Sequence, residues 1–166
     1  MTFFAELARV NHPETEFVDR MGLIMERLGG TRTMGRLTAW LMICDPPDRS
    51  LTELAAELGV SKTAVSTLAR QLGMSGMVER VPTSTREHRY RMADGGWAQV
   101  MRVQLAVLEQ SLDTLDFGLS ILGHDRSGQR SRVEDTRDYF AFILHDSDKM
   151  FERWKEYRES RLDVNP

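Results

Sequence analysis

The chain has 166 residues, and its 22 lysines and arginines against 25 aspartates and glutamates give a formal net charge of −3. This length favours one domain with appended helices, and the near-neutral balance excludes a wholly basic nucleic-acid coat and a polybasic membrane binder. The single cysteine, Cys44, excludes an internal disulfide framework and a cysteine-rich zinc site, and it fits a reducing cytoplasm. We expect no secretory signal and no membrane span, because no run approaches ~18 apolar residues.

Two amphipathic helices are predicted ahead of the central region. Apolar residues recur at helical spacing over residues 17–28, and the glycine pair at 29–30 ends that segment. A second helix is expected at 34–44. The two prolines within residues 45–48 stop it, because proline removes a backbone donor and restricts the residue before it.

The next segment predicts two short helices joined by a tight turn. Ser50 and Glu53 form a capping-box pattern at the start of helix 51–58. Gly59 is placed to close that helix in a left-handed conformation. Ser61 is a good N-cap for the helix that follows, which runs to about residue 75.

A β-hairpin follows these helices. Residues 77–82 and 87–92 are expected as strands on either side of a polar tip at 83–86. Helix, turn, helix and hairpin in this order predict a winged helix-turn-helix. In that motif, helix 51–58 braces helix 62–75, and the second helix reads DNA.

Two long helices are predicted at the end of the chain, at about 94–122 and 129–162, with a hinge at 123–128. Their apolar stripes hold more large side chains than a small domain can cover, which predicts pairing with a second copy as a homodimer. The open alternative is that they fold back on their own domain. The predicted fold class is mainly α with a small β-hairpin wing. It comprises an N-terminal helical dimerisation segment at 1–32, a winged helix-turn-helix DNA-binding domain at 33–93 and long C-terminal dimerisation helices at 94–166.

The outward face of the second short helix carries groups suited to a DNA contact. No acid lies between Ser61 and Ser75, whereas an ordinary amphipathic surface helix would more often carry glutamate and aspartate there. Hydroxyls and cations on this face suit phosphates and base edges. They belong to Lys62, Thr63, Ser66, Thr67 and Arg70. The alternative is an ordinary solvated helix face.

Positive charge concentrates in the same part of the chain. Segment 61–91 holds six cations and two acids, a net charge of +4, so the remaining residues carry −7. A basic patch on an acidic body binds phosphate locally and repels it elsewhere. We expect Arg86 and Arg89 of the wing to contact DNA, with Arg86 placed to enter a narrow minor groove. The alternative is that these arginines only blunt an exposed edge strand.

Two further features are candidates for regulatory sites. Five aromatic residues are candidates for lining an effector pocket between the dimer helices and the DNA-binding lobe, with core packing as the alternative. They are Phe17, Trp40, Trp97, Tyr139 and Phe140. Cys44 is a candidate redox switch, but its apolar face without a nearby basic residue favours a buried structural thiol.

No motif in the chain predicts catalysis. The four histidines are scattered and show no helical metal-ligand spacing. There is no Gly-rich phosphate loop, nucleophile elbow or paired-carboxylate signature. We therefore expect no enzymatic activity, no cofactor and no metal site.

Three stretches of the chain carry a family resemblance: residues 35–47, 50–72 and 77–92. They resemble the winged-helix regulators of the MarR superfamily, and most closely its GbsR-like branch. The resemblance implies a homodimeric repressor or activator on a pseudo-palindromic operator, often responsive to a small-molecule effector. It also implies that residues at the start of the recognition helix read the major groove. Here these are Ser61, Lys62, Thr63, Ser66 and Thr67.

The wing departs from the family pattern at its tip. The family often carries Asp-Arg there, whereas this chain has Thr85 followed by Arg86, so the arginine is kept and the orienting acid is missing. The resemblance assigns both residues to the DNA contact. Arg70 would lie nearer the DNA backbone.

These observations predict a cytoplasmic, homodimeric transcriptional regulator that binds double-stranded DNA in a sequence-specific manner. The alternative from another class is a winged-helix protein–protein adaptor. Such an adaptor would carry an apolar or acidic outward face on its second helix, and residues 61–75 carry neither.

Overall fold

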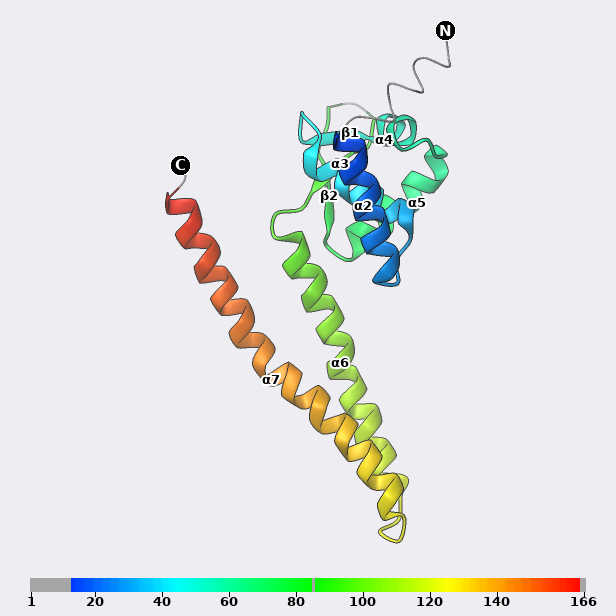
Figure 1. The fold of residues 1–166 in the computed structure, drawn as a ribbon, viewed down its shortest axis with the longest axis vertical. Coiled ribbons are helices and arrows are strands. Elements are labelled where there is room, and N and C mark those ends of the chain that lie inside the picture. Colours follow the sequence, from blue (N-terminus) through cyan, green and yellow to red (C-terminus); the bar gives the residue numbers. More distant parts are fainter. Residues whose placement is uncertain (1–12, 85, 165–166) are drawn as a thin grey trace. The chain divides into compact units, whose positions relative to one another are not determined.

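The computed structural model describes residues 13–84 and 86–164, which divide into two compact units between Val100 and Met101. The first unit contains two helices, the helix-turn-helix segment, a small sheet and the start of a long helix (Figure 1). The second contains the rest of that helix and the last helix. This is the mainly helical winged-helix fold that the sequence predicts.

Helices α2 (Pro13–Arg27) and α3 (Arg32–Ile43) pack against each other within the first unit. Their closest approach needs residues without side chains, because a Cβ on Gly35 would lie 2.6 Å from the Met21 carbonyl oxygen and 2.8 Å from the Gly22 Cα. The described part of the predicted N-terminal segment is thus joined to the winged helix, rather than standing apart from it.

Helices α4 (Leu51–Leu58) and α5 (Lys62–Met74) are the predicted helix-turn-helix. The capping box at the start of α4 is confirmed: the Glu53 amide donates to Ser50 Oγ at 3.2 Å, and the Ser50 amide donates to Glu53 Oε2 at 2.7 Å. Gly59 ends α4 with φ +68°, in the left-handed region. Ser61 caps α5 by accepting a hydrogen bond from the Ala64 amide at 3.1 Å.

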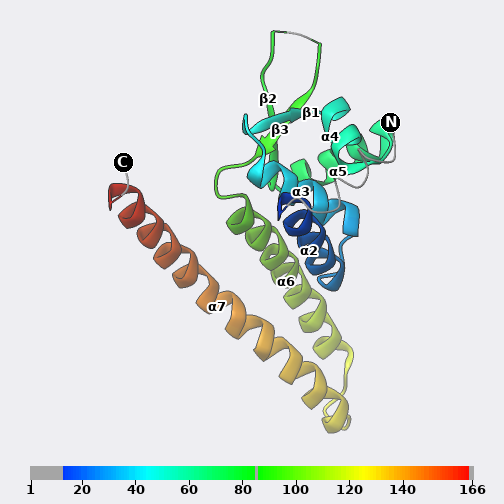
Figure 2. The same ribbon diagram turned by 45° about the horizontal axis from the view of Figure 1, so that its top comes forward.

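A three-stranded antiparallel sheet completes the first unit, in the order β1-β3-β2. Strands β2 (Val78–Val81) and β3 (Arg89–Met92) form the predicted wing, which Figure 2 shows as an extended hairpin. Strand β1 (Asp48–Ser50) was not predicted, because three residues are too few to show an alternating pattern. In the register, Arg89 pairs with Ser50 on one side and with Val81 on the other.

The core of the first unit lies between α3, α4, α5 and the sheet. Its buried apolar residues are Val18, Leu37, Ala39, Leu41, Leu54, Leu58, Val65, Leu72, Met77 and Val78. Arg36 ties the surrounding helices together, since its Nη1 donates to the Leu58 carbonyl at 3.0 Å and its Nε lies 2.9 Å from Asp19 Oδ1. The core therefore holds α4 and α5 at a fixed angle.

Helices α6 (Gly96–Ile121) and α7 (Ser127–Val164) run antiparallel in the second unit, joined by residues 122–126. Arg130 Nη1 donates to the carbonyls of Leu119 and Leu122, each at 2.9 Å, and Arg102 lies 4.0 Å from the centre of the Phe151 ring. Among residues 101–162, Phe151 is the one apolar residue classed as buried. The two helices thus leave most of their apolar stripe uncovered within one chain.

Within the described parts of the chain, no helix has the length and apolarity needed to cross a bilayer.

Candidate nucleic-acid interface

The outer face of α5 stands free of the core. Val65, Ala69 and Leu72 are buried, so helical spacing turns the opposite side to the surface. The predicted DNA-contacting residues on this helix and at its N-cap are all exposed. They are Ser61, Lys62, Thr63, Ser66, Thr67 and Arg70.

The lysine and arginines of α5 and the wing differ in whether a carboxylate of the protein neutralises their charge. Lys62, Arg70, Arg80 and Arg86 are exposed and have no ion-pair partner among the residues that the structure describes. By contrast, Arg91 Nε lies 2.5 Å from Glu79 Oε1 of the neighbouring strand. Four cations thus remain available to an external anion.

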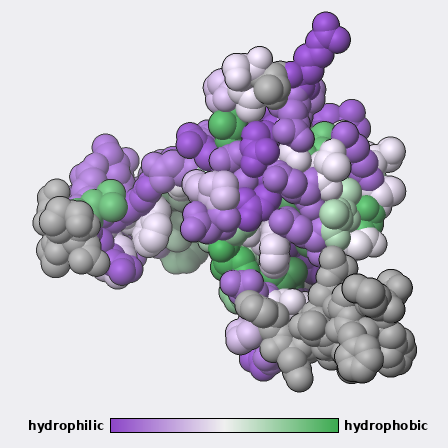
Figure 3. Space-filling model, turned by 90° about the horizontal axis from the view of Figure 1, so that it is seen from above, coloured by the Kyte–Doolittle hydropathy of each residue, from purple (hydrophilic) through white to green (hydrophobic). Residues whose placement is uncertain are grey.

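The N-terminus of α5 adds to this positive surface. Its first turn contains no acid, so the partial positive charge of the helix end is not compensated locally. Free amides and an exposed lysine at a helix start favour phosphate binding. In the space-filling view from above, hydrophilic residues cover most of the central face, with small apolar patches between them (Figure 3).

The wing places Arg86 beyond the sheet. The hairpin stalk is closed by Thr83, whose Oγ1 donates to the Glu87 carbonyl at 2.9 Å, and Arg86 lies exposed between these two residues. Thr85, the other predicted contact at the tip, lies outside the described residues. The exposed tip fits the predicted minor-groove position of Arg86.

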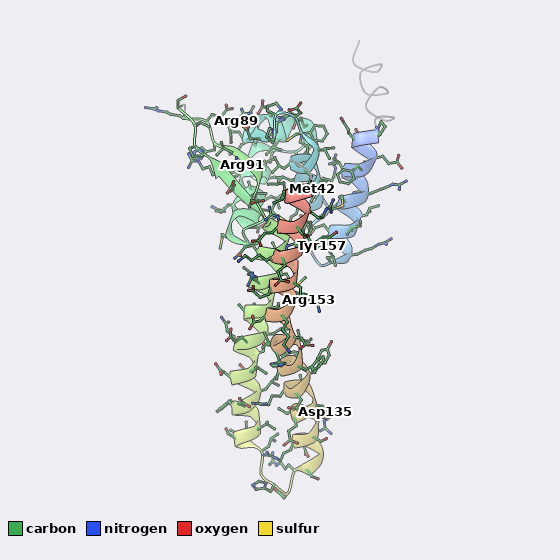
Figure 4. The ribbon with its side chains drawn as sticks, turned by 90° about the vertical axis from the view of Figure 1, so that its left-hand side faces the viewer. Met42, Arg89, Arg91, Asp135, Arg153 and Tyr157 are labelled. Atoms are coloured by element: carbon green, nitrogen blue, oxygen red, sulfur yellow. The ribbon has the colours of Figure 1, made fainter. Side chains whose placement is uncertain are left out.

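Arg89 is partly buried and contacts carboxylates of its own chain. Its side chain is 23% exposed, and its guanidinium contacts Asp48, Glu53 Oε2 at 3.2 Å and Glu87 Oε2 at 3.6 Å. The hydrogen bond to the Asp48 side chain, with the negative charges of Glu53 and Asp48, raises the pKa of Arg89. Figure 4 shows Arg89 and Arg91 on the hairpin side of the first unit. Sequence reasoning missed these contacts, because nothing in a local pattern pairs residues 41 positions apart.

The five aromatic residues predicted for an effector pocket belong to different units. Trp97 lines a hollow of about 590 Å³ in the first unit, while Tyr139 and Phe140 lie on α7 with ring centres 6.3 Å apart. Phe17 is 38% exposed on α2 and Trp40 packs beside the core. The hollow is lined by Leu41, Met42, Pro47, Glu79, Arg91, Met92, Ala93, Asp94 and Trp97.

Cys44 is half-buried at the end of α3, where its Sγ lies 3.9 Å from the Leu41 carbonyl oxygen. Burial raises the pKa of the thiol. Arg49, held by Glu57 at 3.2 Å, acts in the opposite direction with a smaller effect. The expectation that no basic residue lies near Cys44 is therefore wrong, but the net effect of burial and charge still disfavours the reactive thiolate.

Candidate metal ligands do not cluster in residues 13–84 and 86–164, where no three His, Cys, Asp or Glu side chains are placed to hold an ion.

Comparison with known proteins identifies the family. The chain is 37% identical over 130 residues to the HTH-type transcriptional regulator MmpR5 of Mycobacterium tuberculosis (strain ATCC 25618 / H37Rv), covering 77% of this chain and 78% of the relative. Residues 95–157 match the family model of the MmpR5-like MarR family transcriptional regulators. The chain belongs to the MarR family of transcriptional regulators. The GbsR-like branch is not confirmed.

A solved structure supports the assignment of this MarR-family chain. A crystal structure of a transcriptional regulator matches with a TM-score of 0.79 at 31% identity, covering 87% of this chain and 99% of the other. Both relatives are transcriptional regulators. This MarR-family chain is therefore a winged-helix transcription regulator of a DNA-binding family, and the adaptor alternative is not favoured.

Proposed function

We propose that this MarR-family regulator acts in the cytoplasm as a homodimer that binds a pseudo-palindromic operator. Each protomer reads one half-site with the outer face of α5 and places Arg86 of the wing in the neighbouring minor groove. The observation that carries this proposal is the exposed, acid-free face of α5, with its cations unpaired among the described residues.

The residues of this face divide by chemistry. Lys62, Thr63, Ser66 and Thr67 lie on the first turns of α5 and suit contacts with base edges in the major groove. Arg70 lies three residues beyond Thr67 and suits the DNA backbone, as does the exposed Arg80 of β2. Ser61 uses its hydroxyl oxygen to cap α5 and can still donate its hydrogen to a phosphate.

The homodimer is supported by the apolar side chains that α6 and α7 leave exposed. The largest exposed fractions are 65% for Phe117, Ile121 and Phe142, 62% for Tyr139 and Leu162, and 54% for Val107. An apolar surface of this kind is typical of a protein interface. A two-fold dimer would set two recognition helices about one DNA turn apart, roughly 34 Å.

A small-molecule effector, if it regulates this protein, would act by binding the DNA-competent and incompetent forms with different affinity. The hollow beside Trp97 is the candidate place within the first unit, because it joins apolar walls to the charged pair of Glu79 and Arg91.

The proposal is tested by selecting bound duplexes from a random DNA pool and then measuring affinity for the selected site at several salt concentrations. We expect two inverted half-sites. Arg86→Ala should weaken binding by about 1–3 kcal/mol and lower the slope of log K against log salt by about 0.9 if the guanidinium neutralises one phosphate.

Arg126→Ala is the matched control, because it removes the same charge from the exposed connection between α6 and α7. Its affinity and slope should stay close to those of the wild-type protein. Enrichment of no sequence at all, with equal weak binding of every duplex, would instead support the adaptor function.

A further inference from the structure

We propose that Arg89 is a positioning residue, which fixes the wing against the start of α4 and so determines where Arg86 meets DNA. This inference rests on the proposed function. It replaces the direct DNA contact that sequence reasoning expected of Arg89.

The contacts of Arg89 converge from three parts of the first unit. Asp48 belongs to β1, Glu53 to the first turn of α4, and Glu87 to the returning arm of the wing. Arg89 Nη2 also donates to the Asp48 carbonyl at 3.2 Å. A planar guanidinium that donates in several fixed directions holds its partners in one relative orientation.

The same contacts involve the helix cap. Glu53 Oε2 accepts the Ser50 amide hydrogen at 2.7 Å and lies 3.2 Å from Arg89 Nη1. The amide of Leu51, the first residue of α4, donates to the His88 carbonyl of the wing at 3.3 Å. The wing base and the beginning of the helix-turn-helix therefore share one hydrogen-bonded cluster, so moving one disturbs the other.

This cluster lies close to the residue that it would position. Arg86 precedes Arg89 by three residues, about 10 Å of extended chain. The two strands of the wing are only four residues long, and of these only β3 also pairs with β1. An anchor at its base thus limits how far the tip can swing.

Arg89 does not serve as a further phosphate ligand, because carboxylates of the protein already neutralise its charge. It is faced by the carboxylates of Asp48, Glu53 and Glu87, which together exceed its single charge. A phosphate approaching this cluster would meet net negative charge. Without Arg89, the three carboxylates would repel one another and loosen the wing base.

A double-mutant cycle separates positioning from direct contact. Affinity for the selected operator is measured for wild type, Arg86→Ala, Arg89→Gln and the double variant. We expect each single variant to bind about five- to tenfold more weakly, and the double variant to bind no more weakly than Arg86→Ala alone. A direct phosphate contact by Arg89, or a general loss of folded protein, would make the two effects multiply, and that result overturns the inference.

Arg91→Gln is the matched control. It removes an arginine from the same strand and the same face, but Arg91 is paired with Glu79 and not with α4. Its effect on affinity should be smaller than that of Arg89→Gln. Arg89→Lys keeps the positive charge but lacks the planar guanidinium, so it should recover only part of the operator affinity that Arg89→Gln loses.

A second measurement needs no DNA. Amide hydrogen exchange of the free protein should be faster in Arg89→Gln than in wild type at Leu51 and along the wing, and unchanged at buried amides of α3. Unchanged exchange at Leu51 and the wing would overturn the positioning role. If the wild-type protein binds no duplex, the proposed function fails, whereas this measurement still decides whether Arg89 anchors the wing.

Discussion

At the scale of single residues, the outer face of α5 combines exposure with a set of side chains that suit nucleic acid. Lys62 and Thr63 occupy the first two positions of the helix, where an exposed side chain is free to approach a groove. Ala64 and Val65 turn toward the protein directly after them. In the proposed function, DNA is therefore read by a few side chains whose direction is fixed by the buried face of the same helix.

Replacing Lys62 and Thr63 together by alanine should reduce the preference for the operator over random duplex. Each lost base contact typically costs about 1–3 kcal/mol, and neither change touches the core. Competition binding with operator and random DNA at one salt concentration measures the preference. Retention of the full operator preference would place the reading residues elsewhere.

Cys44 should react slowly with iodoacetamide at neutral pH. Burial raises the pKa of its thiol, so a smaller fraction is thiolate at pH 7 than in an ordinary exposed cysteine. The rate should rise with pH up to values above the usual thiol pKa. A rate at pH 7 equal to or faster than that of free cysteine would reinstate the redox switch as a hypothesis.

At the scale of elements, caps and glycines determine how the helices begin, end and approach one another. The capping box of Ser50 and Glu53 starts α4. Gly59 ends the helix in the left-handed conformation, which would be strained for a residue with a side chain. Gly22 and Gly35 let α2 and α3 approach closely. These residues therefore determine how α3 and α4, the helices against which α5 packs, are placed.

Gly35→Ala should destabilise the protein by about 1–3 kcal/mol. The added methyl group would lie 2.6 Å from both the Met21 carbonyl oxygen and the Met25 Cβ, so the helices must separate. Gly73→Ala is the control, because its Cβ would meet the nearest atom at 3.8 Å within α5. It should raise stability by about 0.5–1 kcal/mol. Urea unfolding measures both, and equal stability of the two variants would contradict the close approach.

At the scale of the whole molecule, the second unit leaves exposed the apolar side chains that a helical pair would be expected to bury. Phe117 on α6 and Phe142 on α7 are each 65% exposed. Exposure of this extent along two long helices costs solvation free energy unless another surface covers it. Covering by a second copy would also supply the two-fold symmetry that a pseudo-palindromic operator requires.

The double variant Phe117→Glu, Phe142→Glu should shift the protein from twice the 19.0 kDa mass of one chain toward a single chain. Placing charges on an apolar interface costs several kcal/mol, and operator binding should fall with the dimer. Sedimentation equilibrium measures the mass.

The control, Gln104→Glu with Ser131→Glu, adds the same charges at exposed polar positions of the same helices and should stay dimeric. A single-chain mass for the wild-type protein would refute the homodimer.

Local patterns predicted the helices and their ends because the physics behind them is local. Helical spacing of apolar residues predicted each helix described in the structure to within a few residues. Ser50 and Ser61 were both predicted as caps, Ser50 together with its hydrogen-bond partner Glu53. The exposed face of α5 also follows from spacing alone. Strand β1 escaped prediction because its three residues pair with β3, a segment about 40 positions further along the chain.

The amino-acid sequence by itself determined the winged helix-turn-helix, the placement of positive charge on it and the exposed side of α5. These features depend on neighbours within one or two turns of the chain. Only the tertiary structure decided that Arg89 faces three carboxylates, that Arg86 has no ion-pair partner among the described residues, and that α2 joins the first unit. Arginines three residues apart look alike in sequence, and only folding decides which of them faces acids brought from distant segments.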